Sequence, residues 1–307
     1  MSANELDKIK FGTDGWRGII GFDFNLSNLS RVVVASCQEL YYQYFEETNS
    51  KKILIGYDRR FMANVFAKEM TSFVKGCGFE PILSTSDVPT PSCSLYAKKF
   101  MFLGCLVITA SHNPYNWLGL KIKSFKGCSV DESFTKEVEK RLLLGNSIEK
   151  LEGAYEKVDI KKFHLDQIKS NFNVDFIVNH LKKMNLQIFV DSMHGSAANC
   201  ISQIFDDYDS KIVTEIRADY DPLFGGNPPE PLQKYSENLT EILLRNSKKG
   251  IKTLGIIFDG DGDRIAVIDE KGRFCSTQDL LPFFISYLGE KNKNLYPVLK
   301  TVSGSDI

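Results

Sequence analysis

The chain has 307 residues, 43% of them hydrophobic, and its 38 lysines and arginines nearly balance 39 aspartates and glutamates, which argues against nucleic acid or an anionic membrane as the main partner. No apolar run approaches the ~20 residues of a membrane-spanning helix, and the charged first residues lack the apolar run of a signal peptide, so we expect a soluble, cytoplasmic protein. Seven cysteines, an odd number without a closely spaced metal-binding pair, agree with reduced thiols in that compartment.

Strands and helices alternate through the first part of the chain, where a first domain is expected over residues 1–160. Helices are expected at 25–46, 62–76, 92–99 and 131–144, and strands at 52–58, 79–83, 102–108 and 120–123. This alternation predicts βαβ units and a largely parallel sheet. The polar region 145–161 is expected to lead to the domain boundary.

The alternation continues in a second expected domain, residues 161–275. Its helices are expected at 175–183, from 197 and at 235–248, and its strands at 186–191, 211–216, 254–258 and 265–268. A third unit, 276–307, begins with an expected helix at 278–288 and an expected strand at 297–302. Because a lone helix and strand cannot bury their apolar faces, we expect this unit to be incomplete. The predicted fold class is α/β, with consecutive βαβ-type domains and mixed, largely parallel sheets.

A loop with a serine follows the apolar strand at 102–108. Its sequence is Thr-Ala-Ser-His-Asn-Pro at residues 109–114, which places Ser111 at the C-terminal end of that strand. Ligands bind at this edge of open α/β sheets. Taken alone, the loop is also typical of a structural turn, because Ser111, Asn113 and Pro114 all favour bends.

A second loop, residues 258–264, carries Asp259, Asp261 and Asp263 separated by glycines. Three carboxylates that can point at one position suit a hard divalent cation. Without a cation they would repel one another and their pKa values would rise. The spacing also fits part of a calcium-binding helix-loop-helix loop, but Arg264 stands where that module needs glycine, and the β-branched flanks predict strands instead of helices.

Together, these loops resemble the α-D-phosphohexomutase family, whose members interconvert sugar 1- and 6-phosphates. Two further stretches carry the resemblance: residues 11–18 are similar to the N-terminal active-site loop of the family, and residues 224–232 to its second-domain connecting loop. The four motifs follow the family's order. The family has four domains, so the resemblance implies that most of the third domain and all of the fourth are missing here, and we expect poor turnover.

The resemblance implies a phosphoserine at Ser111, and a Mg²⁺ ion held by Ser111 with Asp259, Asp261 and Asp263. Hexose 1,6-bisphosphate would be the intermediate and activator, and a sugar phosphate the small-molecule partner. The resemblance also implies roles for four further residues. Arg17 and Arg264 would bind the phosphoryl oxygens, and His112 would line the site. Lys121 would take part in proton transfer or contact the phosphate. One departure is Leu118-Gly119, where the family usually has Asn-Gly.

Other polar residues receive structural interpretations. Lys123 is predicted to lie on a solvated strand edge, the run Asp58-Arg59-Arg60 to form a surface turn, and His194 to be hydrogen-bonded in a turn after a strand.

Two other functions stay open from the sequence: a metal-binding or regulatory module without catalysis, and a phosphatase with an aspartate nucleophile, which would leave the serine loop without a role. The sugar also stays open, although the Thr109-Ala110 pair looks more like the phosphoglucomutase and phosphomannomutase members than the glucosamine branch. The sequence does not define an oligomeric state.

Overall fold

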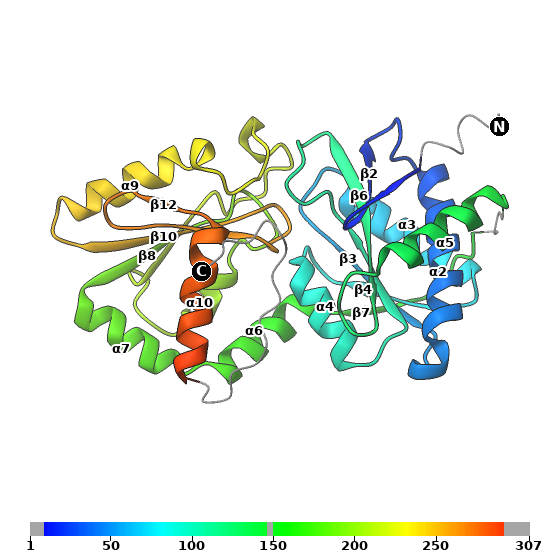
Figure 1. Cartoon of the computed structure of the whole chain (residues 1–307), viewed down its shortest axis with the longest axis horizontal. Coiled ribbons are helices and arrows are strands. Elements are labelled where there is room, and N and C mark those ends of the chain that lie inside the picture. The colour runs from blue at the N-terminus through cyan, green and yellow to red at the C-terminus, as the bar shows by residue number, and fades with distance from the viewer. Residues whose placement is uncertain (1–8, 146–149, 292–307) are drawn as a thin grey trace.

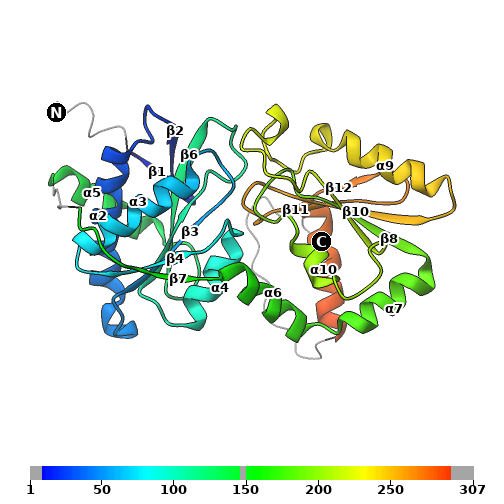
Figure 2. The ribbon, with the colours of Figure 1, turned by 180° about the vertical axis from the view of Figure 1, so that it is seen from behind.

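The structure is a computed structural model that describes residues 9–145 and 150–291. Two α/β lobes lie side by side (Figures 1 and 2). The first lobe contains a seven-stranded sheet in the order β1-β2-β6-β5-β3-β4-β7. Its strands are β1 (Phe11–Gly12), β2 (Gly15–Ile19), β3 (Lys52–Tyr57), β4 (Glu80–Ser84), β5 (Gly104–Ile108), β6 (Trp117–Ser124) and β7 (Glu156–Val158).

Helices cover both faces of this sheet because successive strand residues point to opposite sides. In β3, Ile53 and Ile55 belong to the larger apolar cluster, and Leu54 belongs to the cluster on the other face. The helices of the larger cluster are α2 (Leu26–Thr48), α3 (Ala63–Gly76) and α5 (Glu132–Leu143). Helix α4 (Thr90–Lys99) covers the opposite face, and its Cys93 and Ala97 are buried there.

The second lobe contains a five-stranded sheet in the order β12-β11-β10-β8-β9. Its strands are β8 (Leu186–Asp191), β9 (Val213–Ile216), β10 (Lys252–Phe258), β11 (Ile265–Ile268) and β12 (Phe274–Cys275). Helix α7 (Val174–Met184) packs on one face through Val178, and α9 (Glu237–Ser247) packs on the other through Leu239 and Leu243. The shorter helix α8 (Cys200–Ile204) and the 3-10 turns η1 (Phe224–Gly226) and η2 (Gln233–Tyr235) lie in the connections.

The α/β class with mixed sheets is confirmed, but the antiparallel part is larger than the alternation predicted. Strands β5, β3, β4 and β7 are parallel, whereas β6 runs back beside β5 and pairs antiparallel with both β5 and β2. In the second sheet, β10, β8 and β9 are parallel and β11 returns antiparallel to β10. In both sheets, the antiparallel strand directly follows its neighbour in the chain: β6 follows β5, and β11 follows β10. The loop between each pair lies at the C-terminal end of β5 or β10.

The polar region 145–161, which the sequence suggested as the approach to a domain boundary, contains a strand of the first sheet and the start of a helix. Strand β7 adds to the first sheet, and the helix α6 (Ile160–Asn171) follows it directly. Figures 1 and 2 show α6 between the two lobes, next to α4. The side chain of Phe163 packs on Tyr96 and Phe100 of α4, with ring centroids 4.9 and 5.5 Å apart.

The helix expected at 278–288 is α10 (Thr277–Lys291). The strand expected at 297–302 lies outside the described residues. Within 9–145 and 150–291, none of the helices combines the length and apolar character needed to cross a membrane. All seven cysteines fall in these ranges, and each is a free thiol.

Candidate active site between the two lobes

Ser111 lies at the end of β5, as the sequence predicts, and it reaches the second lobe. Ser111 is 1% exposed, and its backbone takes the left-handed conformation, with φ of 51°. The side chain of Thr109 accepts a hydrogen bond from the Ser111 amide at 2.8 Å. The Ser111 hydroxyl donates to Asp259 Oδ2 across the lobe boundary at 2.9 Å. The serine loop and the acidic loop therefore meet at one point.

The acidic loop turns between β10 and β11. Asp259 Oδ1 accepts hydrogen bonds from the amides of Asp263 and Arg264, at 3.0 and 3.1 Å, so the side chain closes its own loop. Gly260 lets the two loops touch, because a Cβ built there would lie 2.6 Å from the Ser111 carbonyl oxygen. The sheet strands on both sides rule out the calcium-binding helix-loop-helix, as the sequence indicated.

The three carboxylates of this loop fit a divalent cation. One oxygen from each of Asp259, Asp261 and Asp263 lies within 4.8 Å of the others. The Asp261 side chain is fully buried, and among the described residues its Oδ1 has no hydrogen-bond partner. Burial, together with the neighbouring carboxylates, raises the pKa of Asp259 well above its usual value. A cation bound among these oxygens would relieve both costs.

Lys121 supplies a positive charge beside the same carboxylates. Its ammonium lies 2.8 Å from Asp261 Oδ2, 2.6 Å from Asp263 Oδ2 and 2.8 Å from Asp14 Oδ2. Burial opposes the charge on Lys121, yet the three carboxylates raise its pKa above the usual value. The same ammonium is a main reason why the pKa of Asp14 falls despite burial. Lys121 therefore holds its proton while it faces the acidic loop.

The prediction for Lys123 is wrong. Lys121 and Lys123 do share one side of β6, but that side is covered, and Lys123 is only 6% exposed. Its ammonium pairs with Asp14 Oδ1 at 3.1 Å and donates to Ser129 Oγ at 2.7 Å. The physical reason is the N-terminal loop, which carries Asp14 over this part of the strand.

Three more predicted residues surround the serine loop. Arg17, on β2, donates from Nη1 to Asn113 Oδ1 at 2.5 Å. His112 Nδ1 lies 3.4 Å from Ser111 Oγ, and burial together with Arg264 lowers the pKa of this imidazole. The Arg264 side chain remains 44% exposed.

Glu230 links two of these groups from the segment 224–232. Its Oε1 lies 3.9 Å from His112 Nε2 and 3.9 Å from Arg264 Nη1. All four motifs that the sequence analysis singled out therefore contribute residues to this region.

The prediction of a surface turn at residues 58–60 is also wrong. Asp58, Arg59 and Arg60 are 2%, 9% and 1% exposed. Since β3 lies directly beside β5 in the sheet, the end of β3 is covered by the serine loop and by the second lobe. Arg59 Nη1 donates to the carbonyl of Ala218 at 2.8 Å, and so it joins the first lobe to the second.

The prediction for His194 is confirmed. It lies in the turn after β8, with φ of 58°, and its amide donates to the Arg217 carbonyl at 2.7 Å. Leu118, which stands where the family usually has asparagine, belongs to the core. Its side chain is fully buried in the larger apolar cluster.

Sequence reasoning missed two further contacts of the site. Thr90 Oγ1 donates to Asp261 Oδ2 at 2.5 Å, and the Thr90 amide donates to the Asp261 carbonyl at 2.9 Å. The other is the carboxylate of Asp14. In the sequence, Asp14 could have been recognised as a candidate from its position in the glycine-rich loop that also contains Arg17. Thr90 could have been recognised from its position between two prolines at the start of a helix.

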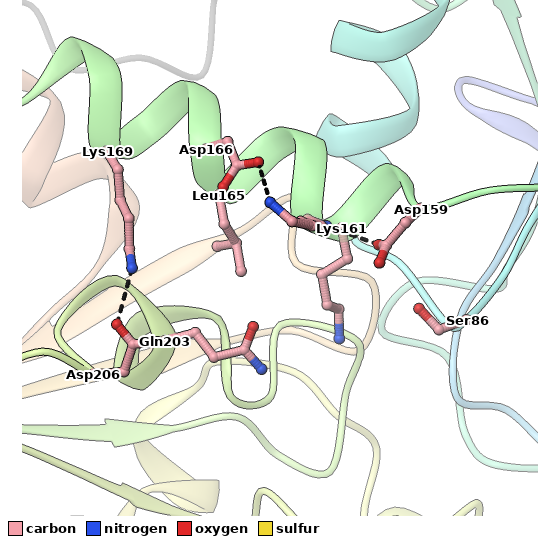
Figure 3. Close-up of a pocket in the computed structure, with 9 residues that line it drawn as sticks. Ser86, Asp159, Lys161, Leu165, Asp166, Lys169, Gln203 and Asp206 are labelled. Carbon is pink, nitrogen blue, oxygen red and sulfur yellow. Dashed lines mark hydrogen bonds and ion pairs between the residues drawn. The ribbon is translucent and has the colours of Figure 1, made fainter.

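A separate cavity of about 410 Å³ lies under α6, away from these loops. Figure 3 shows Lys169 directed at Asp206, with which it pairs at 2.9 Å. Lys162 pairs with Asp166 at 2.6 Å. Lys161, on the same helix, pairs with Asp87 at 3.2 Å. Because these lysines have acidic partners, the cavity offers little net attraction for an anion.

The fold and site thus define an α/β protein with a serine that faces, across two lobes, an acidic loop whose carboxylates fit a divalent cation. Comparison with known families agrees with this arrangement. The profile "Phosphoglucomutase/phosphomannomutase, alpha/beta/alpha domain I" matches residues 8–147, and the corresponding domain II profile matches residues 162–272. The chain belongs to the phosphoglucomutase/phosphomannomutase family, the α-D-phosphohexomutases.

Individual relatives cover much of this chain. A phosphoglucosamine mutase from Methanococcus vannielii is 31% identical over 84% of this chain and 56% of its own length. A phosphoglucosamine mutase from Finegoldia magna is 27% identical over 92% of this chain and 60% of its own. A solved structure described as a "putative phosphomannomutase" from Thermus thermophilus has a TM-score of 0.82 and 28% identity, covering 95% of this chain and 63% of that one.

The chain therefore spans less than two thirds of the length of each of these three relatives. The names of these relatives also differ in the sugar, since the two curated ones are named phosphoglucosamine mutases and the solved structure is described as a "putative phosphomannomutase".

Proposed function

We propose that this chain interconverts hexose 1-phosphates and hexose 6-phosphates through a phosphorylated Ser111 and a hexose 1,6-bisphosphate. The observation that carries the proposal is the 2.9 Å hydrogen bond from the Ser111 hydroxyl to Asp259, which joins the serine loop to the acidic loop. In each transfer, a bond forms between phosphorus and one oxygen, Ser111 Oγ or a sugar oxygen, while the bond to the other breaks. Catalysis of phosphoryl transfer depends mainly on positioning and on neutralising charge.

The residues around Ser111 suit these two tasks. We assign the metal site to Ser111, Asp259, Asp261 and Asp263, which would hold Mg²⁺ as a Lewis acid for the phosphoryl oxygens when it is bound. Lys121 is assigned to phosphate contact or proton transfer. The carboxylates around it raise its pKa, so that it faces the transferring group as a charged hydrogen-bond donor.

The remaining assigned residues border the serine loop. Arg17 and Arg264 are assigned to the phosphoryl oxygens, because guanidinium groups bind phosphate through paired hydrogen bonds. His112 is assigned to the wall of the site, where its ring lies beside the serine hydroxyl.

We further propose domains at 1–160, 161–275 and 276–307, and the presence of two separate sheets supports the first two. The seven free thiols support a cytoplasmic location. The sugar remains open among glucose, mannose and glucosamine phosphates, since the relatives differ in name.

The replacement Ser111→Ala tests this function. Incubation with Mg²⁺ and glucose 1,6-bisphosphate labelled with ³²P is expected to add one phosphoryl group to the wild-type chain and none to the variant, measured by intact mass and radioactivity. Ser84→Ala is the control, because Ser84 is also a buried serine and its hydroxyl donates to the nearby Ser86 carbonyl. Labelling that survives in Ser111→Ala contradicts the proposal.

Labelling, together with measurements of Mg²⁺ binding and of the products formed from each hexose 1-phosphate, separates the two alternatives. A metal-binding module would bind Mg²⁺ without labelling of Ser111. A phosphatase would release inorganic phosphate from each hexose 1-phosphate without forming the 6-phosphate isomer.

A further inference from the structure

The guanidinium of Arg60 holds the backbone of the serine loop from below. Its Nη2 donates to the carbonyls of Ser111 and Asn113, at 2.6 and 2.7 Å. Its Nη1 donates to the carbonyls of Pro114 and Trp117, at 2.8 and 3.1 Å. One side chain therefore donates hydrogen bonds to four carbonyls within residues 111–117, the segment that begins with Ser111.

The conformation of Ser111 needs this support. The left-handed region is unfavourable for a non-glycine residue, and Ser111 has φ of 51°. With that φ, its hydroxyl points at Asp259 in the other lobe. The hydrogen bond from Arg60 to the Ser111 carbonyl holds the peptide group between Ser111 and His112, next to the Cα that carries this hydroxyl.

Arg60 is itself held rigidly. Its side chain has no exposure to solvent, and its Nε lies 3.3 Å from Asp58 Oδ2, on a carboxylate that is equally buried. Asp58 Oδ1 accepts the Arg60 amide at 3.0 Å. The other face of the guanidinium lies over the Phe224 ring of the second lobe, with Cζ 5.0 Å from the ring centroid. The fork is therefore fixed before any ligand binds.

Lysine could not reproduce this arrangement. A guanidinium is planar and offers five donors in a fixed fork, whereas an ammonium is a point charge with three donors on a flexible stem. The full set of four carbonyls could not be satisfied by one ammonium.

We propose that Arg60 is a positioning residue for phosphoryl transfer, which holds Ser111 in the left-handed conformation with its hydroxyl directed at the acidic loop. The chemical part of this inference rests on the proposed function. The part that concerns the conformation of the loop does not.

The first test measures chemistry. Arg60→Lys is compared with Arg141→Lys. Arg141 is a partly buried arginine that pairs with the carboxylate of Glu39, away from the serine loop. In rapid-quench experiments with Mg²⁺ and saturating ³²P-labelled glucose 1,6-bisphosphate, Arg60→Lys is expected to slow labelling of Ser111 about 10- to 100-fold. The bisphosphate dissociation constant is expected to change less than about threefold, because the misplaced group is the nucleophile and the binding groups remain. Arg141→Lys should keep the wild-type rate.

The second test needs no substrate. Hydrogen exchange is followed at the amides of Asn113 and Trp117, which donate to the carbonyls of Ala110 and Pro114 within the loop. Both amides are expected to exchange faster in Arg60→Lys and at the wild-type rate in Arg141→Lys. Unchanged exchange overturns the positioning role, whether or not the chain takes up label.

The two tests separate the two proposals. If the wild-type chain takes up no label, the proposed function fails, and exchange alone decides on Arg60. If the wild-type chain and Arg60→Lys take up label equally fast, the role of Arg60 fails and the proposed function stands. Should circular dichroism show that Arg60→Lys does not fold, Asp58→Asn, which keeps the side-chain shape but removes the charge that orients Arg60, is expected to give the same two changes to a smaller extent.

Discussion

Asp14 is the residue whose charge connects the two lysines of β6. Its carboxylate contacts Lys121 and Lys123 and accepts a hydrogen bond from Ser129. Burial works against ionisation, but Lys121, Ser129 and Lys123 outweigh it and hold the pKa of Asp14 below the usual 3.8. Because the folded pKa lies below the unfolded pKa, the stability from Asp14 is fully present above that usual value and is lost as the pH falls below it.

The replacement Asp14→Asn should therefore destabilise the chain in a pH-dependent way. We expect a loss of about 1–3 kcal/mol in the free energy of unfolding at pH 7, and a shrinking difference from wild type as the pH falls below 4. Urea unfolding across this range measures it. Asp207→Asn, at an exposed position, is the control and should give a small constant difference. A difference that grows toward low pH contradicts the assignment.

At the residue scale, the sequence identified side chains by chemistry but not by burial. Ser111 and the three aspartates stood out because their types and spacing suit one reaction. Arg60 and Lys123 did not, since a charged residue next to a turn or on an alternating strand is usually solvated. What covers them comes from segments far away in the chain: the serine loop for Arg60, and the N-terminal loop for Lys123. Local patterns do not contain that information.

At the element scale, the close contact between the two site loops depends on the absence of a side chain at Gly260. A Cβ there would lie 2.6 Å from the Ser111 carbonyl oxygen and 2.8 Å from Pro229 Cγ. The first contact is with backbone, which cannot yield without moving a loop. The Gly260 carbonyl is also an acceptor for the Ser196 amide, at 3.0 Å, so the acidic loop is held on its other side as well.

We therefore expect Gly260→Ala to lower both stability and cation binding. The loss in the free energy of unfolding should be about 1–3 kcal/mol, as for other overpacked sites. Mg²⁺ affinity, measured by isothermal titration calorimetry, should fall because the carboxylates move away from Ser111. Gly12→Ala is the matched control, since a Cβ at Gly12 has its nearest neighbour at 3.6 Å, an ordinary contact. Wild-type Mg²⁺ affinity in Gly260→Ala would show that the loops can separate without cost.

Most elements of the sheets could be predicted from the sequence, because their periodicity is local. Helix α2 begins after Asn25, whose side chain accepts the Asn28 amide, as its capping position predicted. Helix α6 was missed, because it follows a polar stretch that reads as a linker. Its apolar contacts are with α4, through Phe163, and this packing supplies the stability that its own sequence does not indicate.

At the scale of the whole molecule, the lobes are joined by polar contacts around the site. Thr90 reaches Asp261, and Ser111 reaches Asp259. Arg59 makes a third connection further from the acidic loop: its Nε pairs with Asp87 in its own lobe, and its Nη1 donates to the Ala218 carbonyl in the other. Ser111 and Asp259 both belong to the proposed site, and Thr90 holds Asp261, a proposed metal ligand, so the relative position of the lobes and the geometry of the site depend on each other.

Arg59 offers a way to loosen the lobes without altering the proposed metal ligands. Arg59→Gln removes the hydrogen bond to the Ala218 carbonyl and the ion pair with Asp87, and we expect faster hydrogen exchange in residues 216–220, where the second lobe loses this anchor. The amides of the serine loop should keep their exchange rates, because Arg60 still binds their carbonyls. Arg273→Gln, which breaks an ion pair with Asp269 in the same turn, is the control. If exchange at 216–220 is the same in wild type and Arg59→Gln, Arg59 does not hold the lobes together, and the contacts of the site itself must do so.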